Sequence, residues 1–221
     1  PAICVPLLVK YLNNRDIENV IITTKLIDNE KNQVLKSNNG IKVHSCKVIG
    51  IKKIKYSWSL EKILVKEVTE DTIIHVHSIW TYPSYLGYKI SKKKNLPLIV
   101  STRGTLYKWA LEQSKIVKII ALSFFQKRML KNADILHITE PNEKTALNNL
   151  KIYNKTSLIP DGIEIETQFN DLDHELLMRF QYNKSKIYIM FLGRIVHNKG
   201  LHYLLNSYER LKMTYTNVEI L

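Results

Sequence analysis

Cysteine is scarce in this sequence, and the two cysteines, Cys4 and Cys46, lie too far apart to form a CxxC pair. Two such residues argue against a disulfide scaffold. We interpret both as reduced thiols in the core of a cytoplasmic protein. No Asp-x-Asp motif and no cluster of His with carboxylates is present either, so we expect no metal site.

Long uncharged stretches are also missing. The longest, residues 72–88, contains two His, two Ser, two Thr and a Pro, a polar content that a membrane-spanning helix does not tolerate. The first residues lack a basic start followed by an apolar run, so we expect no signal peptide. The seven glycines include no G-x-G pair and no GK[ST], which argues against a dinucleotide fingerprint and a Walker loop.

Acidic residues are few, 20 Asp and Glu against 33 Lys and Arg. Residues 1–160 hold 26 basic and 12 acidic side chains, whereas residues 161–221 hold 7 and 8, so the excess positive charge lies entirely in the first part. A solvated Lys-rich surface explains this charge, and so does a basic domain that faces an anionic membrane surface or a nucleic acid. The 45% hydrophobic content excludes an intrinsically disordered chain.

What is present is a regular alternation of helical and strand patterns. We expect helices over residues 3–15, 58–70, 82–94, 112–131, 141–150 and 201–211. We expect strands over residues 19–24, 41–46, 71–77, 96–101, 133–139, 156–159, 186–192 and 217–221. This alternation predicts an α/β fold with a Rossmann-like, doubly wound parallel sheet.

The segment Pro160-Asp161-Gly162 interrupts the alternation. We therefore place a first Rossmann-like domain at residues 1–160, a hinge or linker at 161–185 and the start of a second Rossmann-like domain at 186–221. The second domain has too few elements to bury a sheet. The first opens on a helix without the usual preceding strand and Gly-rich loop, so we expect a chain truncated at both ends.

One arrangement suits a phosphate group. Gly193-Arg194 follows a predicted strand and Lys199-Gly200 begins a helix, at the sheet edge where nucleotides bind in α/β proteins. Gly193 would let the backbone approach an anion, while Arg194 offers a bidentate fork and Lys199 a point charge near a helix N-terminus. An ordinary tight turn would show the same pattern.

Four segments in order resemble motifs of the retaining GT-B glycosyltransferases of family 4. Residues 71–80 are similar to the family's strand with His-x-His, a small residue and an aromatic, and residues 159–163 to its Ile-Pro-Asn-Gly-Val hinge. Residues 193–200 match its diphosphate signature, and residues 101–111 resemble a stretch of a subgroup that builds bacterial surface polysaccharides. That subgroup has Arg at position 103, where many relatives have His. The family's Glu-x7-Glu motif would lie beyond residue 221.

The resemblance implies a glycosyltransferase that moves a sugar from a nucleotide-sugar to an acceptor with retention of configuration. It implies a role in lipopolysaccharide, capsule or exopolysaccharide synthesis. The basic first domain beside a near-neutral second one suggests a lipid-linked glycan acceptor. We expect no metal or other cofactor, and no nucleic acid partner because the positive charge is scattered and no nucleic-acid-binding signature is present. The expected location is the cytoplasm, peripheral on the anionic inner face of the plasma membrane. Arg194 and Lys199 would steady the departing diphosphate with Gly193, and His77 and Arg103 are the expected catalytic residues, which position the acceptor.

Within the first domain, we expect His75 and His77 to point to opposite sides of their strand. His75 would pack within the sheet, and His77, at the carboxyl end, would line the acceptor pocket. Arg103 would face the same crevice, where it contacts substrate or pairs with a nearby carboxylate. Trp80 is also expected to pack loops, and Glu140 and Glu143 to serve as favourable charges in the first turn of a helix. The further candidates for the acceptor pocket are Ser78, Trp80 and Gly104.

Two other functions remain open from the sequence. The chain could be a non-catalytic, truncated remnant of such an enzyme. More distantly, it could be a basic nucleic-acid-binding module, with residues 52–58 as a patch of lysines and aromatics. We also expect the 221 residues to be inactive alone, because the carboxylates that hold the donor sugar would lie after Leu221.

Overall fold

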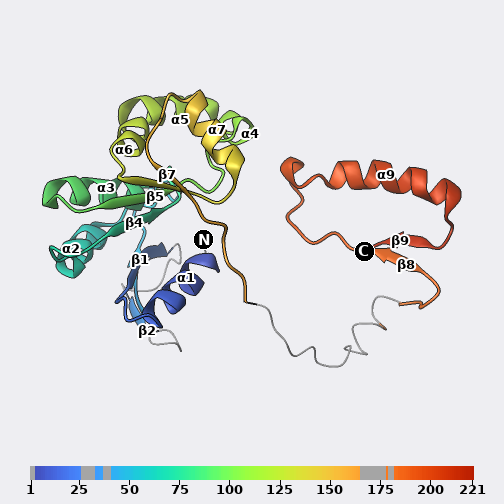
Figure 1. Cartoon of the computed structure of the whole chain (residues 1–221), viewed down its shortest axis with the longest axis horizontal. Helices are drawn as coiled ribbons and strands as arrows, with labels where there is room; N and C mark the ends of the chain where they lie inside the picture. The colour runs from blue at the N-terminus through green and yellow to red at the C-terminus, as the bar shows by residue number, and fades with distance from the viewer. Residues whose placement is uncertain (1–2, 26–32, 37–40, 165–177, 179–181) are drawn as a thin grey trace. The chain divides into compact units, whose positions relative to one another are not determined.

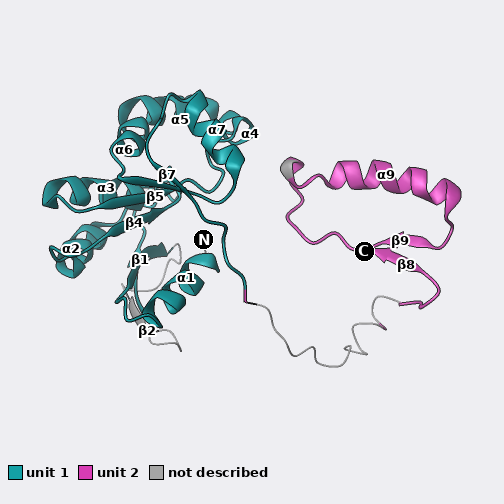
Figure 2. Ribbon diagram, viewed as in Figure 1, with its two compact units in different colours: residues 1–163 teal, residues 164–221 magenta. Residues whose placement is uncertain are grey.

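The computed structural model describes residues 3–25, 33–36, 41–164, 178 and 182–221 (Figure 1). The chain divides into two compact units, residues 1–163 and 164–221 (Figure 2). Most of the predicted linker at 161–185 lies outside the described residues. The two units are therefore treated separately below.

Unit 1 alternates helices and strands in the predicted order. Its helical segments are α1 (Cys4–Asn13), α2 (Trp58–Glu67), α3 (Tyr82–Lys94), α4 (Lys108–Glu112), α5 (Lys115–Ala121), η1 (Leu122–Gln126), α6 (Lys127–Lys131) and α7 (Pro141–Asn149). Its strands are β1 (Val20–Lys25), β2 (Gln33–Lys36), β3 (Lys42–Lys47), β4 (Ile74–His77), β5 (Leu98–Ser101), β6 (Ile135–Ile138) and β7 (Thr156–Leu158).

The strands of unit 1 form two sheets. Strands β4, β5, β6 and β7 lie side by side in sequence order, and every pair is parallel. In the other sheet, β1 pairs with β3 in parallel and β2 pairs with β3 in antiparallel fashion. The predicted α/β class with a parallel sheet is confirmed. The sequence pattern missed β2, a short strand at the edge of its sheet.

The core of unit 1 lies between the β4–β7 sheet and its helices. The central strands are buried on both faces, as their continuous apolar runs require, and Leu98, Val100 and Leu136 are fully buried. Helix α3 packs on β4, and α2 packs on α3 as well as on β1 and β3, so α2 connects the two sheets. In Figure 1, α4, α5, α6 and α7 gather on one side of the β4–β7 sheet.

The single helix predicted over 112–131 is wrong in detail. The helix is interrupted between α4 and α5, where Ser114 adopts a left-handed backbone with φ of 57°. From Lys115 the helix runs on to Lys131, but its middle turn, η1, is a π-helix. A π turn inserts one extra residue and rotates the side chains that follow it, so the exposed and buried faces do not keep a simple helical period.

Unit 2 contains two parallel strands, β8 (Ile187–Ile189) and β9 (Val218–Ile220), a short 3-10 turn η2 (His197–Lys199) and helix α9 (Leu201–Thr214). This strand–helix–strand order confirms the sequence pattern. None of the residues of α9 is buried, and Tyr203 is 68% exposed. Across both units, no helix in the described residues has the length and apolar character needed to cross a bilayer.

Gly87 allows α3 to lie close to β4, which gives a test of this packing. A Cβ atom at this position would lie 2.9 Å from Cγ2 of Val76, a contact that real structures do not tolerate. We expect Gly87→Ala to lower the free energy of unfolding by about 1–3 kcal/mol, the usual cost of overpacking a core. Urea denaturation measures the change.

The matched control for this substitution is Gly162→Ala. An added Cβ at Gly162 meets no atom within 4 Å, so we expect unfolding to be unchanged within about 0.5 kcal/mol. Equal midpoints for the wild type and both variants would contradict the close packing of α3 on β4.

Candidate functional site

Polar side chains gather where β4, β5 and β6 end. The parallel register places His77 beside Ser101 and Ser101 beside His137. Ligands of open α/β sheets bind at the carboxyl ends of the strands, so this edge is the first place to look for a site. His137 was not among the predicted residues, although its position in the strand register could have indicated it.

A chain of hydrogen bonds joins three of these strands. Nε2 of His137 lies 2.8 Å from the carbonyl oxygen of Ile159, and its Nδ1 lies 2.7 Å from Oγ of Ser101. Nε2 of His75 lies 2.8 Å from the same hydroxyl. Because a carbonyl only accepts, a neutral His137 must carry its proton on Nε2. Ser101 then donates to His137 and accepts from Nε2 of His75. Each ring thus has a defined tautomer.

The prediction that His75 and His77 point to opposite sides is wrong. Residues two apart on a strand share a face, and the centroids of the two rings are 4.0 Å apart. Burial, together with the nearby His137 and Arg103, lowers the pKa of His75 to about 4. Burial, His75 and Arg103 lower the pKa of His77 to about 3. Both rings are therefore neutral at pH 7.

Arg103 connects this edge to the segment that follows β7. Its Nη1 pairs with Oδ2 of Asp161, and its Nη2 lies 3.4 Å from Nδ1 of His77. The Arg103 side chain is only 11% exposed, so the predicted pairing with a nearby carboxylate is the arrangement seen. Burial opposes ionisation of Asp161, but hydrogen bonds from Arg103 and Cys4 keep its pKa below the ordinary value. Cys4 is only partly buried, which corrects its assignment as a core thiol.

The buried carboxylate of Glu143 holds the loop after β5. One oxygen accepts hydrogen bonds from the hydroxyl of Thr102 and, at 2.9 Å, from the backbone N–H of Gly104. The other accepts from the N–H and the hydroxyl of Thr139, at 3.0 and 2.7 Å. Burial alone would raise the pKa of Glu143, but these donors outweigh it and lower the pKa. The sequence pattern predicted only a favourable charge in the first turn of a helix and missed that Glu143 holds the loop.

The other acceptor-pocket candidates lie in two loops: Ser78 and Trp80 in the loop after β4, and Gly104 in the loop after β5. Ser78, Trp80 and Arg103 have left-handed backbones, with φ of 74°, 40° and 49°, a conformation that non-glycine residues adopt at a cost. Trp80 packs against the core and has Nζ of Lys118 5.4 Å from its ring centroid, as expected for a residue that packs loops. Its indole N–H is buried without a partner in the described residues.

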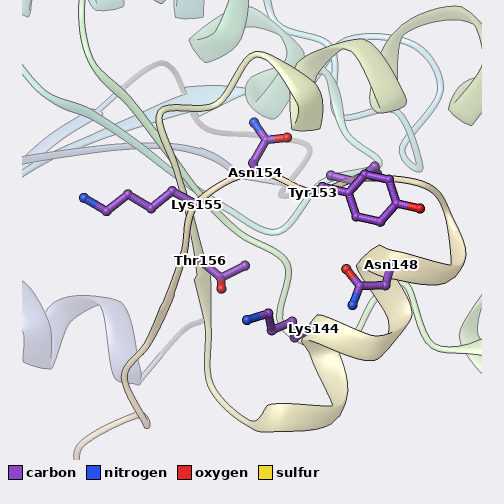
Figure 3. Close-up of a pocket in the computed structure, with 7 residues that line it drawn as sticks. Lys144, Asn148, Tyr153, Asn154, Lys155 and Thr156 are labelled. Atoms are coloured by element: carbon purple, nitrogen blue, oxygen red, sulfur yellow. The ribbon is translucent and has the colours of Figure 1, made fainter.

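A separate hollow of about 400 Å³ lies on α7 and the segment that leads into β7 (Figure 3). Lys144, Tyr153, Lys155 and Thr156 are among the residues that line it. Thr156 is the first residue of β7, so the hollow lies at the amino end of that strand. It is on the opposite edge from the histidines and does not form part of this site.

In unit 2, the predicted diphosphate residues lie in the loop between β8 and α9. A Cβ atom placed on Gly193 would lie 4.0 Å from Cδ of Lys199, so the Lys199 side chain runs beside the glycine. Gly200 has φ of 73° and begins α9. Arg194 and Lys199 are both exposed, and neither forms an ion pair with the described residues. This loop offers exposed cations, of which Lys199 lies two residues before α9, and anions favour a position near a helix N-terminus.

No group of three or more His, Cys, Asp or Glu in the described part of the chain is placed to hold a metal ion. The edge of the β4–β7 sheet presents the neutral imidazoles of His75 and His77, hydroxyl groups and the guanidinium of Arg103, which is paired with Asp161. These groups donate and accept hydrogen bonds, as recognition of a hydroxyl-rich molecule requires.

The sequence and fold match known proteins. A family model described as Glycosyltransferase Family 4 matches residues 3–167. The chain belongs to this family. The match covers the whole sheet edge described above. His75, His77, Arg103 and Glu143 therefore all lie within the region that the family 4 model matches.

One sequence relative and one solved structure extend the comparison. An uncharacterized glycosyltransferase of Methanocaldococcus jannaschii is 28% identical over 176 residues, which cover 76% of this chain and 42% of the relative. The sucrose-phosphate synthase of Thermosynechococcus elongatus has a similar fold, with a TM-score of 0.72 and 17% identity. That similarity covers 98% of this chain and 54% of the synthase. The chain thus spans about half the length of these proteins.

The lowered pKa values of the histidines predict how stability depends on pH. As pH falls below about 6.5, the unfolded chain binds protons at His75 and His77, whereas the folded chain does not until about pH 4 and 3. The free energy of unfolding should therefore decrease as the pH is lowered through this range, by up to about 1.4 kcal/mol per pH unit for each histidine. Urea denaturation between pH 7.5 and 5 measures the slope.

Replacing both rings by Asn should flatten this dependence. His197, which is exposed in unit 2, supplies the control, because His197→Asn removes an imidazole outside the buried pair and should keep the wild-type slope. A wild-type slope in the variant that lacks His75 and His77 would show that these rings titrate normally.

The Glu143 carboxylate can be tested by an isosteric change. Glu143→Gln replaces an oxygen that accepts hydrogen bonds by an amide that donates, which leaves N–H and O–H donors of Thr102, Gly104 or Thr139 unsatisfied. We expect the free energy of unfolding to drop by about 2–4 kcal/mol at pH 7. Glu140, which is exposed and accepts a hydrogen bond from Tyr107, provides the control as Glu140→Gln. Equal losses in the two variants, measured by urea denaturation, would refute the special role of Glu143.

Proposed function

We propose that the full-length protein transfers a sugar from a nucleotide-sugar donor to an acceptor. The observation that carries this proposal is the family match over residues 3–167, which includes every residue of the polar edge. Membership of a glycosyltransferase family favours this function over the nucleic-acid-binding alternative.

The donor diphosphate would bind in unit 2. Arg194 and Lys199 are exposed cations in the loop between β8 and α9, and Lys199 lies two residues before the first residue of α9. The backbone at Gly193 has no side chain to block an anion. Guanidinium groups bind phosphate oxygens through two parallel hydrogen bonds, and an ammonium adds a mobile point charge. Together these groups would stabilise the negative charge that develops on the departing diphosphate.

The acceptor would bind at the edge of the β4–β7 sheet. Nη2 of Arg103 faces Nδ1 of His77 at 3.4 Å, and because a guanidinium only donates, His77 must carry its proton on Nε2. The burial that lowers the pKa of His77 to about 3 keeps it neutral. His77 would thus present one N–H donor to an acceptor hydroxyl or sugar oxygen, and Arg103 would position that ring.

The finer assignments rest on the motifs rather than on the fold. We propose transfer with retention, in which acceptor and diphosphate lie on the same side of the sugar and no protein nucleophile is needed. We further propose a role in bacterial surface-polysaccharide synthesis, with a lipid-linked acceptor, no metal cofactor and a site at the cytoplasmic face of the membrane. The Arg at position 103 and the basic character of residues 1–160 support these proposals.

The donor assignment predicts the effect of a single substitution. In the full-length protein, Arg194→Ala should weaken the binding of a nucleoside diphosphate by about ten- to a hundred-fold, because it removes a charge-assisted fork. Isothermal titration calorimetry measures the affinity. Arg210, an exposed arginine on α9, supplies the control, and Arg210→Ala should leave the affinity unchanged. Equal affinities for all three proteins would remove Arg194 from the donor site.

A further inference from the structure

An exposed apolar surface lies on the first half of the helix that runs from 115 to 131. Five large apolar side chains there face away from the core. They are Ile116, Val117, Ile119, Ile120 and Phe124, with exposed fractions of 74, 67, 52, 52 and 78%. We call this set the α5 face. Ile116 and Ile120 are four residues apart in α5 and share one side of that helix, and we call these two residues and Phe124, which is exposed in the π turn that follows, the apolar stripe.

The first part of this helix, α5, exposes its isoleucines and turns a lysine inward, which is the reverse of an ordinary surface helix. Lys118 turns inward, where its Nζ donates to the carbonyl oxygen of Ala110 and lies over the ring of Trp80. Burial lowers the pKa of this lysine. Gln126 is fully buried. A helix in water normally exposes such residues and buries its isoleucines. The opposite arrangement indicates an apolar partner outside the described part of unit 1.

The charges around the α5 face indicate what kind of partner this is. Residues 105–131 contain six basic side chains and one acidic side chain, Glu112. Lys108, Lys115, Arg128 and Lys131 are exposed. A second copy of this chain would bring like charges together, which is unfavourable. An anionic lipid surface accepts both the apolar stripe and the basic rim.

We propose that the α5 face docks the protein on an anionic membrane surface, with its apolar side chains in the interface and its basic side chains near the lipid headgroups. The identification of the membrane as the location of the acceptor rests on the proposed function. Helix α5 lies at the outer edge of unit 1 in Figure 1. Through the inward-facing Lys118 it contacts Trp80, which follows β4, so the helix that carries the docked face packs on the loop that leads from His77.

Vesicle co-sedimentation tests this proposal on the full-length protein. We expect binding to vesicles of equal parts phosphatidylcholine and phosphatidylglycerol, and weak binding to phosphatidylcholine alone. High salt should release the protein, because it screens the basic rim. The triple variant Ile116→Ser, Ile120→Ser and Phe124→Ser should bind the anionic vesicles at least about ten-fold more weakly, because it removes the apolar stripe.

The matched control changes three other exposed apolar residues of unit 1. Ile17, Ile73 and Tyr153 are 50, 60 and 75% exposed, and their replacement by Ser should leave vesicle binding unchanged.

A second variant does not depend on removing apolar surface. Phe124→Trp should gain tryptophan emission that is quenched by vesicles with brominated acyl chains.

Several outcomes would overturn the proposal. These are equal vesicle binding by the wild type and the triple variant, absence of quenching in Phe124→Trp, and a lipid-independent dimer that the triple variant dissolves. The last outcome would make the α5 face an interface between copies. Vesicle binding without sugar transfer would support membrane docking and contradict the proposed sugar transfer. Transfer to a soluble acceptor without vesicle binding would support sugar transfer and contradict membrane docking.

Discussion

The candidate site depends on one buried carboxylate. Glu143 lies at the start of α7, yet its hydrogen bonds reach Thr102 and Gly104 in the loop after β5. In that loop Arg103 and Gly104 both adopt left-handed backbones, which for Arg103 is unfavourable and must be offset by surrounding contacts. Because Glu143 fixes the residues on either side of Arg103, it determines where the guanidinium points. The contacts of Arg103 with His77 and Asp161 follow from that direction.

The segment that leaves unit 1 is fixed to the same edge at two points. The carbonyl of Ile159 accepts from His137, and Asp161 pairs with Arg103. The first contact belongs to the hydrogen-bonded chain that continues from His137 through Ser101 to His75. A change at the sheet edge would therefore alter the path of the segment after β7, since buried polar groups that lose a partner are costly. Site and exit segment form one hydrogen-bonded structure.

Much of this fold could be predicted, because the signals were local. The bounds of α3 were predicted to the residue. A proline stands in its first turn and three lysines in its last, and Asn95 closes it in the left-handed conformation. The site was harder to predict, since Glu143 is 39 and 41 residues from its partners in the loop and Arg103 is 58 residues from Asp161. Contacts between residues so far apart in the sequence leave no periodic pattern from which they could be predicted. The shared face of His75 and His77, in contrast, follows from strand geometry alone and could have been predicted.

The two units differ in how they present positive charge. At the edge of the β4–β7 sheet the imidazoles of His75 and His77 are neutral at pH 7, and the guanidinium of Arg103 is paired with Asp161. In the loop before α9, Arg194 and Lys199 are exposed and have no ionic partner among the described residues. Neutral donors suit hydroxyl groups, whereas unpaired cations suit phosphates. The electrostatics thus support the proposed division of roles, with the acceptor bound by unit 1 and the donor diphosphate by unit 2.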